Sequence, residues 1–94
     1  MSVYVVTWNI NKERANYSAA RQAFVDHLNR HENLQDSGLE TVRWISSSWT
    51  ARQISDDLQT KLDKNDRLYV SKIVGADQYG WLSQSTWDWI NARL

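Results

Sequence analysis

The sequence predicts an α+β fold built on one sheet, and three observations support this prediction. Residues 3–10 are rich in β-branched and aromatic side chains, which is typical of a strand. Residues 39–48 and 67–74 have the same strand character. The stretches between these segments carry apolar residues at helical spacing, which indicates helices that connect the strands of the sheet.

The first strand is the segment around which the rest of the chain is organised. One face of this strand carries Val3, Val5 and Thr7. The other face carries Tyr4, Val6, Trp8 and Ile10. A strand that is apolar on both faces is buried on both, so we expect it in the middle of the sheet. Asn9 and Asn11 follow at its C-terminal end and form a candidate functional strand end, because loops at such positions carry contacts or chemistry.

A first helix is expected after the polar loop at 11–17. Ser18 is its expected N-cap, and the helix runs to about Glu32. The apolar stripe of this helix consists of Ala20, Ala23, Phe24, His27, Leu28 and His31. The residues at 33–38 break the helical pattern and predict a turn.

The segment at 39–48 is long enough for one strand or for two short strands folded as a hairpin, and periodicity does not choose between them. Thr50 and Gln53 then form a capping box that predicts the start of a second helix. Its expected buried stripe is Ala51, Ile54, Leu58 and Leu62. The polar residues at 64–66 end this helix, and the strand at 67–74 follows.

The C-terminal segment contains a loop at 75–80 and a short helix that starts at Ser83 or Ser85. Three of the six tryptophans lie here, at Trp81, Trp87 and Trp89, and we expect them to dock this tail onto the domain or onto a partner subunit. The expected buried face of the helix carries Trp87, Ile90 and Leu94.

The complete order is β-α-β-β-α-β if the segment at 39–48 is a hairpin. Two β-α-β units with right-handed crossovers then give a ferredoxin-like split βαβ sandwich with an added C-terminal helix, as a single domain over residues 1–94. In such a sandwich the helices cover one face of the sheet. The other face would be apolar and open to solvent, so we expect a homodimer that covers it.

The composition excludes several classes of protein. The net charge is zero, which does not support electrostatic coating of nucleic acid but leaves room for a local basic patch. The absence of cysteine excludes disulfides, thiol nucleophiles and cysteine-ligated zinc. Neither a membrane-spanning run nor a signal peptide is recognisable. We therefore expect a cytoplasmic protein without a membrane partner.

Aromatic residues on three predicted strands form a candidate nucleic-acid or dimer surface. Trp8, Trp44 and Tyr69, with Arg43 beside them, could present rings on one sheet face for base stacking. The glycine-aromatic signature of RNA-recognition domains is missing, so burial in the core or in a dimer interface is the favoured reading.

The titratable residues do not establish a catalytic or metal centre. Asp56 and Asp57 are expected on a solvated helix face near Arg52 and Lys61, and Asp66 at the start of a strand. The histidines His27 and His31 have the i, i+4 spacing that can chelate a metal, but no third ligand accompanies them, which favours packing at the edge of the core. The serines at 46–48 lack a recognisable catalytic partner. We expect no metal and no cofactor.

Three stretches carry a resemblance to a known family: residues 5–12 (VVTWNINK), 41–45 (TVRWI) and 62–68 (LDKNDRL). They resemble the SinR family of small bacterial proteins, which is similar to the small subunit of the CRISPR spacer-acquisition complex and to virulence-associated protein D. The resemblance covers nearly the whole chain and implies a ferredoxin-like homodimer. It also implies a metal-binding aspartate at the end of the first strand, where this chain has Asn9. A neutral amide supplies neither charge nor base, so nuclease activity is not expected.

The sequence therefore predicts a non-catalytic homodimeric interaction module, associated with nucleic acid or with a bacterial defence or mobile-element system. The alternative is a metal-dependent or toxin-like ribonuclease resembling virulence-associated protein D. Neutral charge and Asn9 favour the first reading.

Overall fold

The computed structural model describes residues 1–75 and 77–94. In these residues the chain forms a four-stranded antiparallel sheet and three helices, which confirms the α+β class. The elements are β1 (Ser2–Asn9), α1 (Tyr17–Leu28), β2 (Glu32–Leu34), β3 (Val42–Ser47), α2 (Ala51–Gln59), β4 (Arg67–Lys72) and α3 (Gln84–Arg93). Ala76, within the loop expected at 75–80, lies outside the described residues.

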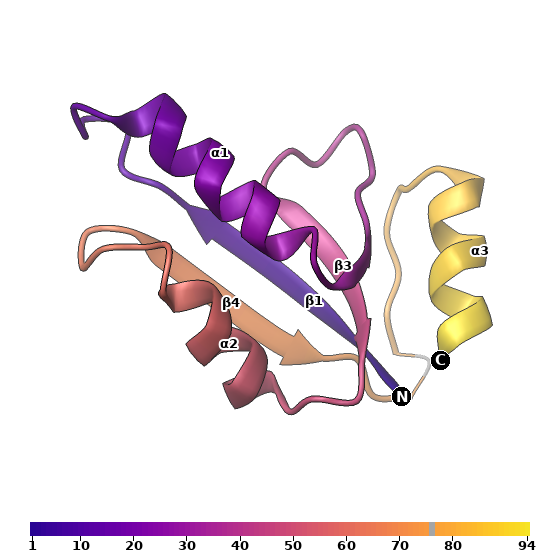
Figure 1. Cartoon of the computed structure of the whole chain (residues 1–94). Helices are drawn as coiled ribbons and strands as arrows, with labels where there is room; N and C mark the ends of the chain where they lie inside the picture. The colour runs from indigo at the N-terminus through magenta and orange to yellow at the C-terminus, as the bar shows by residue number, and fades with distance from the viewer. Residues whose placement is uncertain (76) are drawn as a thin grey trace.

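The strand order is β2-β3-β1-β4, so β1 is an interior strand, as its two apolar faces predict. It pairs with β3 on one side, where Val5 faces Trp44, and with β4 on the other, where Trp8 faces Leu68. Both α1 and α2 lie in front of the sheet in Figure 1. The main core lies between these helices and the face of β1 that carries Tyr4, Val6, Trp8 and Ile10.

The opposite face of the sheet is partly covered by α3. Ile90 of this helix is fully buried and clusters with Val3 of β1 and Trp44 of β3. The expectation of a bare second face is therefore wrong at these positions, because the chain supplies its own cover. The termini lie close together (Figure 1), and Met1 and Leu94 line one pocket.

The first helix and the strand that follows differ from the sequence-based boundaries. The helix begins at Tyr17 after Asn16, which makes no side-chain capping bond, so the expected cap at Ser18 is wrong. It ends at Leu28 rather than near Glu32, because the next residues form a turn and Glu32–Leu34 pairs with β3. The segment at 39–48 therefore holds one strand, and its hairpin partner precedes it.

The capping box at the start of α2 is confirmed. The Thr50 hydroxyl accepts a 3.1 Å hydrogen bond from the Gln53 backbone, and the Gln53 side chain accepts a 2.9 Å bond from the Thr50 backbone. The helix ends at Gln59, before the expected Leu62. Its last turn tightens, since the Lys61 and Leu62 backbone N–H groups donate to carbonyls three residues back.

The end of β4 and the orientation of α3 also differ in part from expectation. The strand ends at Lys72, although Ile73 still donates a backbone hydrogen bond to Val3. Ser83 caps α3, which confirms the first of the two expected starts. The buried face of α3 carries Thr86 and Ile90, whereas Trp87 is only half-buried and Leu94 is 52 % exposed, so the expected stripe is confirmed only at Ile90. None of the described helices combines the length and apolar character that crossing a membrane requires.

Candidate functional site

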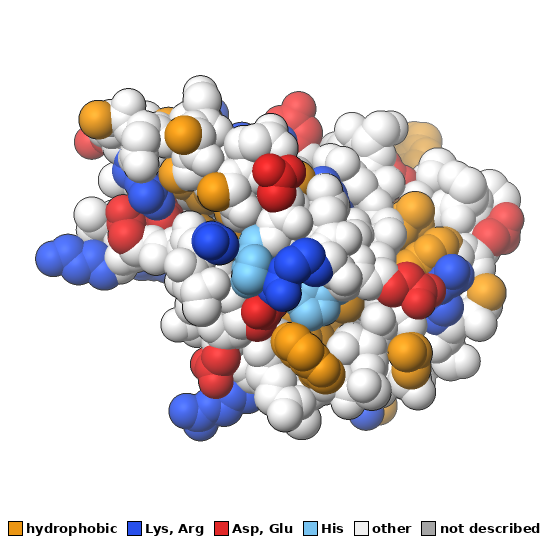
Figure 2. All heavy atoms as spheres, in the orientation of Figure 1, with side chains coloured by type: hydrophobic (Ala, Val, Ile, Leu, Met, Phe, Trp, Pro, Cys, Tyr) orange, Lys and Arg blue, Asp and Glu red, His pale blue; other side chains and the backbone are white. Residues whose placement is uncertain are grey.

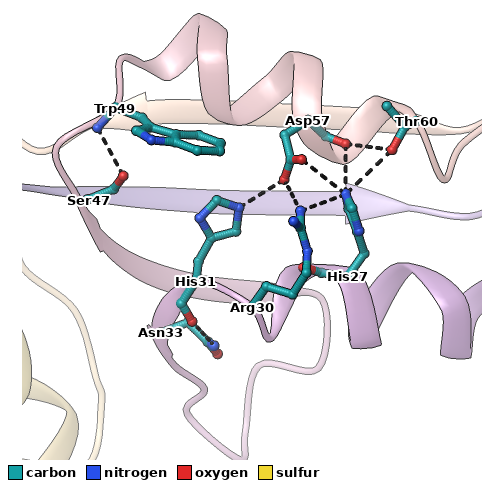
Figure 3. Close-up of polar contacts among 8 residues, drawn as sticks. All are labelled: His27, Arg30, His31, Asn33, Ser47, Trp49, Asp57 and Thr60. Carbon is teal, nitrogen blue, oxygen red and sulfur yellow. Dashed lines mark hydrogen bonds and ion pairs between the residues drawn. The ribbon is translucent and has the colours of Figure 1, made fainter.

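The densest group of polar side chains joins the end of α1 to α2, and its centre is the carboxylate of Asp57. Arg30 Nη2 donates a 2.6 Å hydrogen bond to Asp57 Oδ2. The Nε2 atoms of His31 and His27 lie 3.0 Å from Asp57 Oδ2 and 3.1 Å from Asp57 Oδ1, respectively. Figure 3 shows the three basic side chains converging on this one carboxylate. We call these four residues the Asp57 cluster.

Helical spacing explains why three basic groups reach the same carboxylate. His27, Arg30 and His31 have the i, i+3, i+4 spacing that places side chains on one side of a helical turn. Asp57 faces them from the last turn of α2. Trp49, just before α2, stands at the edge of the cluster, its ring centroid 5.2 Å from that of His31 in a T-shaped arrangement.

Two opposing effects act on the pKa of Asp57. Burial raises the pKa, and the hydrogen bonds from His31 and Arg30 together with the charge of His27 lower it by more. The net pKa of Asp57 lies below its ordinary value, so the carboxylate is charged at neutral pH. The cluster therefore holds a negative charge that its own basic neighbours already compensate.

The cluster corrects the expected placement of the acidic pair on α2. Asp56 is solvated as predicted and makes only a long 3.8 Å contact with Arg52. Asp57, expected on the same face near Lys61, is turned toward α1, and only 19 % of its side chain is exposed. The prediction that the histidines pack at the edge of the core stands, with the addition that both share a carboxylate.

The geometry of the Asp57 cluster is that of a polar clamp between two helices. Figure 2 shows both histidines at the surface, next to basic and acidic side chains. In the part of the chain that the structure describes, no group of three histidine, aspartate or glutamate side chains is arranged to hold a metal ion. The three basic side chains point at Asp57, so the Arg30 guanidinium forms its ion pair within the protein.

At the candidate strand end, Asn9 and Asn11 have different roles. Asn9 is exposed at the last position of β1. The Asn11 side chain instead accepts a 3.0 Å hydrogen bond from the Glu13 backbone and shapes the following loop. The backbone N–H of Asn11 donates a 2.8 Å bond to Asp66, which ties the end of β1 to the start of β4.

Asp66 is the residue at this end of the sheet whose importance the sequence did not reveal. Its side chain is fully buried and accepts hydrogen bonds from the backbone of Asn11 and of Asp63 and from the Arg14 guanidinium at 2.6 Å. Burial alone would raise its pKa, but these bonds and the charge of Arg14 outweigh burial and lower it. In the sequence, an aspartate just before a strand looks like an ordinary turn residue. The burial of Asp66 depends on partners from a distant loop, which the local sequence pattern does not show.

The predicted aromatic surface of Trp8, Arg43, Trp44 and Tyr69 is divided between the two faces of the sheet. Trp8 packs on Phe24 with ring centroids 5.0 Å apart, and Arg43 lies on the same, helix-covered face opposite Val6. Trp44 is buried on the other face, and only Tyr69, 63 % exposed, is available there. A three-ring stacking platform is therefore wrong, because side chains alternate along each strand.

The three tail tryptophans also have separate surroundings. Trp89 is half-buried against the sheet, and the Arg93 guanidinium lies 4.1 Å from the centre of its ring. Trp87 is half-buried and stacks on Tyr79, with ring centroids 6.1 Å apart. Trp81 is fully exposed. Of the three expected docking residues, only Trp89 packs in the cluster beneath α3.

A groove of about 750 Å³, with a lining that is partly polar and partly apolar, lies between the loop that precedes α3 and this helix. We call it the tail groove; its lining side chains are uncharged and come from Gln78, Tyr79, Gly80, Trp81, Leu82, Gln84, Trp87, Asn91 and Leu94. Tyr79 and Trp81 are both fully exposed at this groove. The sequence signal for the groove is the density of tryptophan in the tail, which predicts contact with the domain or with a partner subunit.

Comparison with protein-family models, with curated protein sequences and with solved structures finds no match to this chain. The function is therefore argued from the residues and their geometry.

Proposed function

We propose that this chain is a non-catalytic interaction module with a ferredoxin-like fold, which acts as a homodimer joined through its tail groove. The fold assignment is supported by the element order, two α-connected strand pairs followed by α3, and by the strand order β2-β3-β1-β4. In a split βαβ arrangement each crossover connects strands that have another strand between them, and this order has that property.

The observation that carries the proposal is the full exposure of two aromatic rings, Tyr79 and Trp81, beside a groove without charged side chains. Each such ring presents about 150–250 Å² of surface, so the two together offer roughly 400 Å². A standard interface removes about 800 Å² from each partner. Val74, Leu94 and Met1 are also exposed, and Leu94 lines both the tail groove and the neighbouring apolar pocket. The available surface is thus of the size that a dimer needs.

A second copy of the chain is the occupant that this surface fits best. A two-fold dimer requires one surface that is complementary to itself. The tail groove provides an exposed ring, Trp81, next to an uncharged lining that includes Trp87 and Leu94. Its lining carries no charged side chain, so two copies meet without like-charge repulsion, and a strongly charged partner would gain nothing there.

The non-catalytic part of the proposal rests on Asn9. It is exposed at the end of β1, where the family that the sequence resembles has an aspartate. An amide oxygen binds a divalent cation far more weakly than a carboxylate and cannot act as a base.

The dimer is tested by multi-angle light scattering of the purified chain at about 50 μM, where an ordinary specific dimer forms. We expect the mass of a dimer for the wild type and of a monomer for the double variant Tyr79→Ser/Trp81→Ser. Tyr69→Ser is the matched control, because it removes an exposed ring from the sheet. A monomeric wild type, or a dimer that only Tyr69→Ser disrupts, would contradict the proposal.

The ribonuclease alternative is tested by incubating the protein with labelled RNA and DNA, with and without magnesium. We expect no cleavage above the buffer background. Magnesium-dependent cleavage that disappears in Asn9→Ala would establish the alternative and exclude the non-catalytic reading.

A further inference from the structure

A small pocket of about 180 Å³ lies at the C-terminal end of β1, between the beginning of α1 and the loop that precedes β3. Two basic side chains, Lys12 and Arg21, line it. The other polar side chains of the lining are Asn9, Tyr17, Glu40 and Thr41. We call it the strand-end pocket. It is independent of the tail groove and shares no residue with it.

The two basic side chains of this pocket are available to bind a ligand. Elsewhere in the described chain, Arg14, Arg30 and Arg93 each bind a carboxylate at 2.6 Å. Neither Lys12 nor Arg21 forms an ion pair or a side-chain hydrogen bond within the part of the chain that the structure describes. Glu40, the one acid of the lining, is exposed and pairs with neither. The lining therefore carries two positive charges against the single negative charge of Glu40.

A buried arginine next to this region adds a second, independent observation. Arg43 is only 7 % exposed, and its guanidinium donates hydrogen bonds to the neutral side chains of Asn29, Asn33 and Gln35. Among the residues that the structure describes, its Nε–H has no hydrogen-bond partner. Burial lowers the pKa of Arg43, and the nearby charge of Arg21 lowers it further. Two guanidinium groups thus lie close enough to repel each other, and neither has a carboxylate.

Size and chemistry together select the ligand class. Ordinary small-molecule sites measure about 300–1,000 Å³, so this pocket accommodates a chemical group rather than a whole cofactor. Lysine, arginine and hydroxyl donors around a compact space are the groups that bind phosphate. We propose that the strand-end pocket binds a phosphate group, carried by a nucleotide or by a single-stranded nucleic acid.

Binding at this place explains how a chain of zero net charge could still contact nucleic acid. Lys12 and Arg21 would neutralise the phosphate, with Asn9, Tyr17 and Thr41 as uncharged donors beside them. Arg43 does not line the pocket and would attract the phosphate only through its positive charge. The inference does not depend on dimerisation, because every residue it uses lies in one chain.

The test measures binding of two kinds of probe, inorganic phosphate and a fluorescein-labelled oligothymidylate of about 12 nucleotides. Phosphate is titrated to about 10 mM and followed by amide chemical shifts, and the oligonucleotide is followed by fluorescence anisotropy. We expect Lys12→Gln and Arg21→Gln each to weaken binding about tenfold, and to reduce the dependence of log K on log salt by about 0.7 for the single strand.

Arg52→Gln is the matched control, because Arg52 is a basic residue on α2 whose side chain is 90 % exposed and makes only a 3.8 Å contact. If the wild type binds inorganic phosphate and both pocket variants lose this binding, the ligand is a free phosphate or a nucleotide. Binding of the oligonucleotide alone, lost in the same variants, would identify the nucleic-acid backbone. The proposal fails if neither probe binds, if the pocket variants bind as the wild type does, or if Arg52→Gln loses as much affinity as they do.

Discussion

The carboxylate of Asp36 holds the first turn of α3 through Thr86, whose hydroxyl donates a 2.9 Å hydrogen bond to Asp36 Oδ2 across 50 residues of chain. The Ser83 backbone donates a second bond to the same oxygen at 3.1 Å. Thr86 is almost fully buried, so this contact lies inside the junction between the helix and the loop before β3. One acidic side chain therefore couples the position of α3 to the rest of the domain.

The first prediction concerns the pH dependence of this contact. The backbone bond from Gly38, the backbone bond from Ser83 and the hydroxyl bond from Thr86 lower the pKa of Asp36 below its ordinary value of 3.8. A lowered pKa means that the stabilisation is complete above that ordinary value and is lost as the pH falls through the folded-state pKa. We expect the protection factors of the α3 amides, which correct for the slower intrinsic exchange in acid, to fall below about pH 4.

Asp36→Asn separates this effect from acid unfolding of the whole domain. The variant should show fast exchange of α3 amides already at pH 7, with the amides of β1 still protected. If α3 remains as protected as in the wild type at pH 7, the charge of Asp36 is not what holds the helix.

The second prediction concerns the buried carboxylate of Asp66. Replacement by Ala leaves the Asn11 and Asp63 backbone donors and the Arg14 guanidinium without their acceptor. Loss of a buried charged partner costs about 3 kcal/mol of unfolding free energy. Urea denaturation measures this loss. Asp56→Ala is the control and should cost less than about 0.5 kcal/mol, because Asp56 makes only an exposed contact. Equal costs for the two variants would contradict the role assigned to Asp66.

How far the sequence predicts this fold depends on where the stabilising contacts come from. The faces of β1 and the capping box of Thr50 and Gln53 follow from local pattern, and both are confirmed. β2 was missed because its three residues carry no strand pattern of their own. It exists through pairing with β3, where Leu34 lies opposite Trp44.

The polar centres were less predictable than the strands for the same reason. The spacing of His27, Arg30 and His31 showed that they share one side of a helical turn, but only the packing of α1 against α2 brings Asp57 to them. Likewise, Lys12 and Arg21 lie nine residues apart in a loop and a helix, and no period connects them with Thr41. Contacts between distant segments leave no periodic signal in one sequence.

The third prediction compares two Arg–Asp pairs of the same chemistry. Arg30, in the turn after α1, and Asp57 of α2 are 2.6 Å apart, whereas Arg52 and Asp56 lie one turn apart on α2 at 3.8 Å. A double-mutant cycle with alanine should give a coupling of about 1 kcal/mol for the first pair, since its carboxylate is mostly buried. The second pair should give about 0.3 kcal/mol or less. A first coupling no larger than the second would mean that the Asp57 cluster does not clamp the helices.

The last prediction concerns how α3 is attached. Ile90 is fully buried against Val3 and Trp44. Ile90→Ala should therefore leave a cavity and cost about 2–5 kcal/mol of unfolding free energy. Trp87 is half-buried, lies outside the cluster around Ile90 and stacks on Tyr79, so Trp87→Ala should cost less, about 1 kcal/mol, despite the larger side chain removed. Thermal and urea unfolding of the two variants measure the difference.

Light scattering of the same two variants separates the inner and outer sides of the helix. Trp87→Ala should weaken the dimer while the fold stays intact, because Trp87 lines the tail groove. Ile90→Ala should lower the melting temperature first, since its side chain is not accessible to a partner. Truncation after Tyr79 removes both sides at once and uncovers Val3 and Trp44, so it should lower the stability and abolish the dimer. A truncated chain that keeps its melting temperature would show that α3 is a mobile arm, and the tail would then be an element for binding another protein.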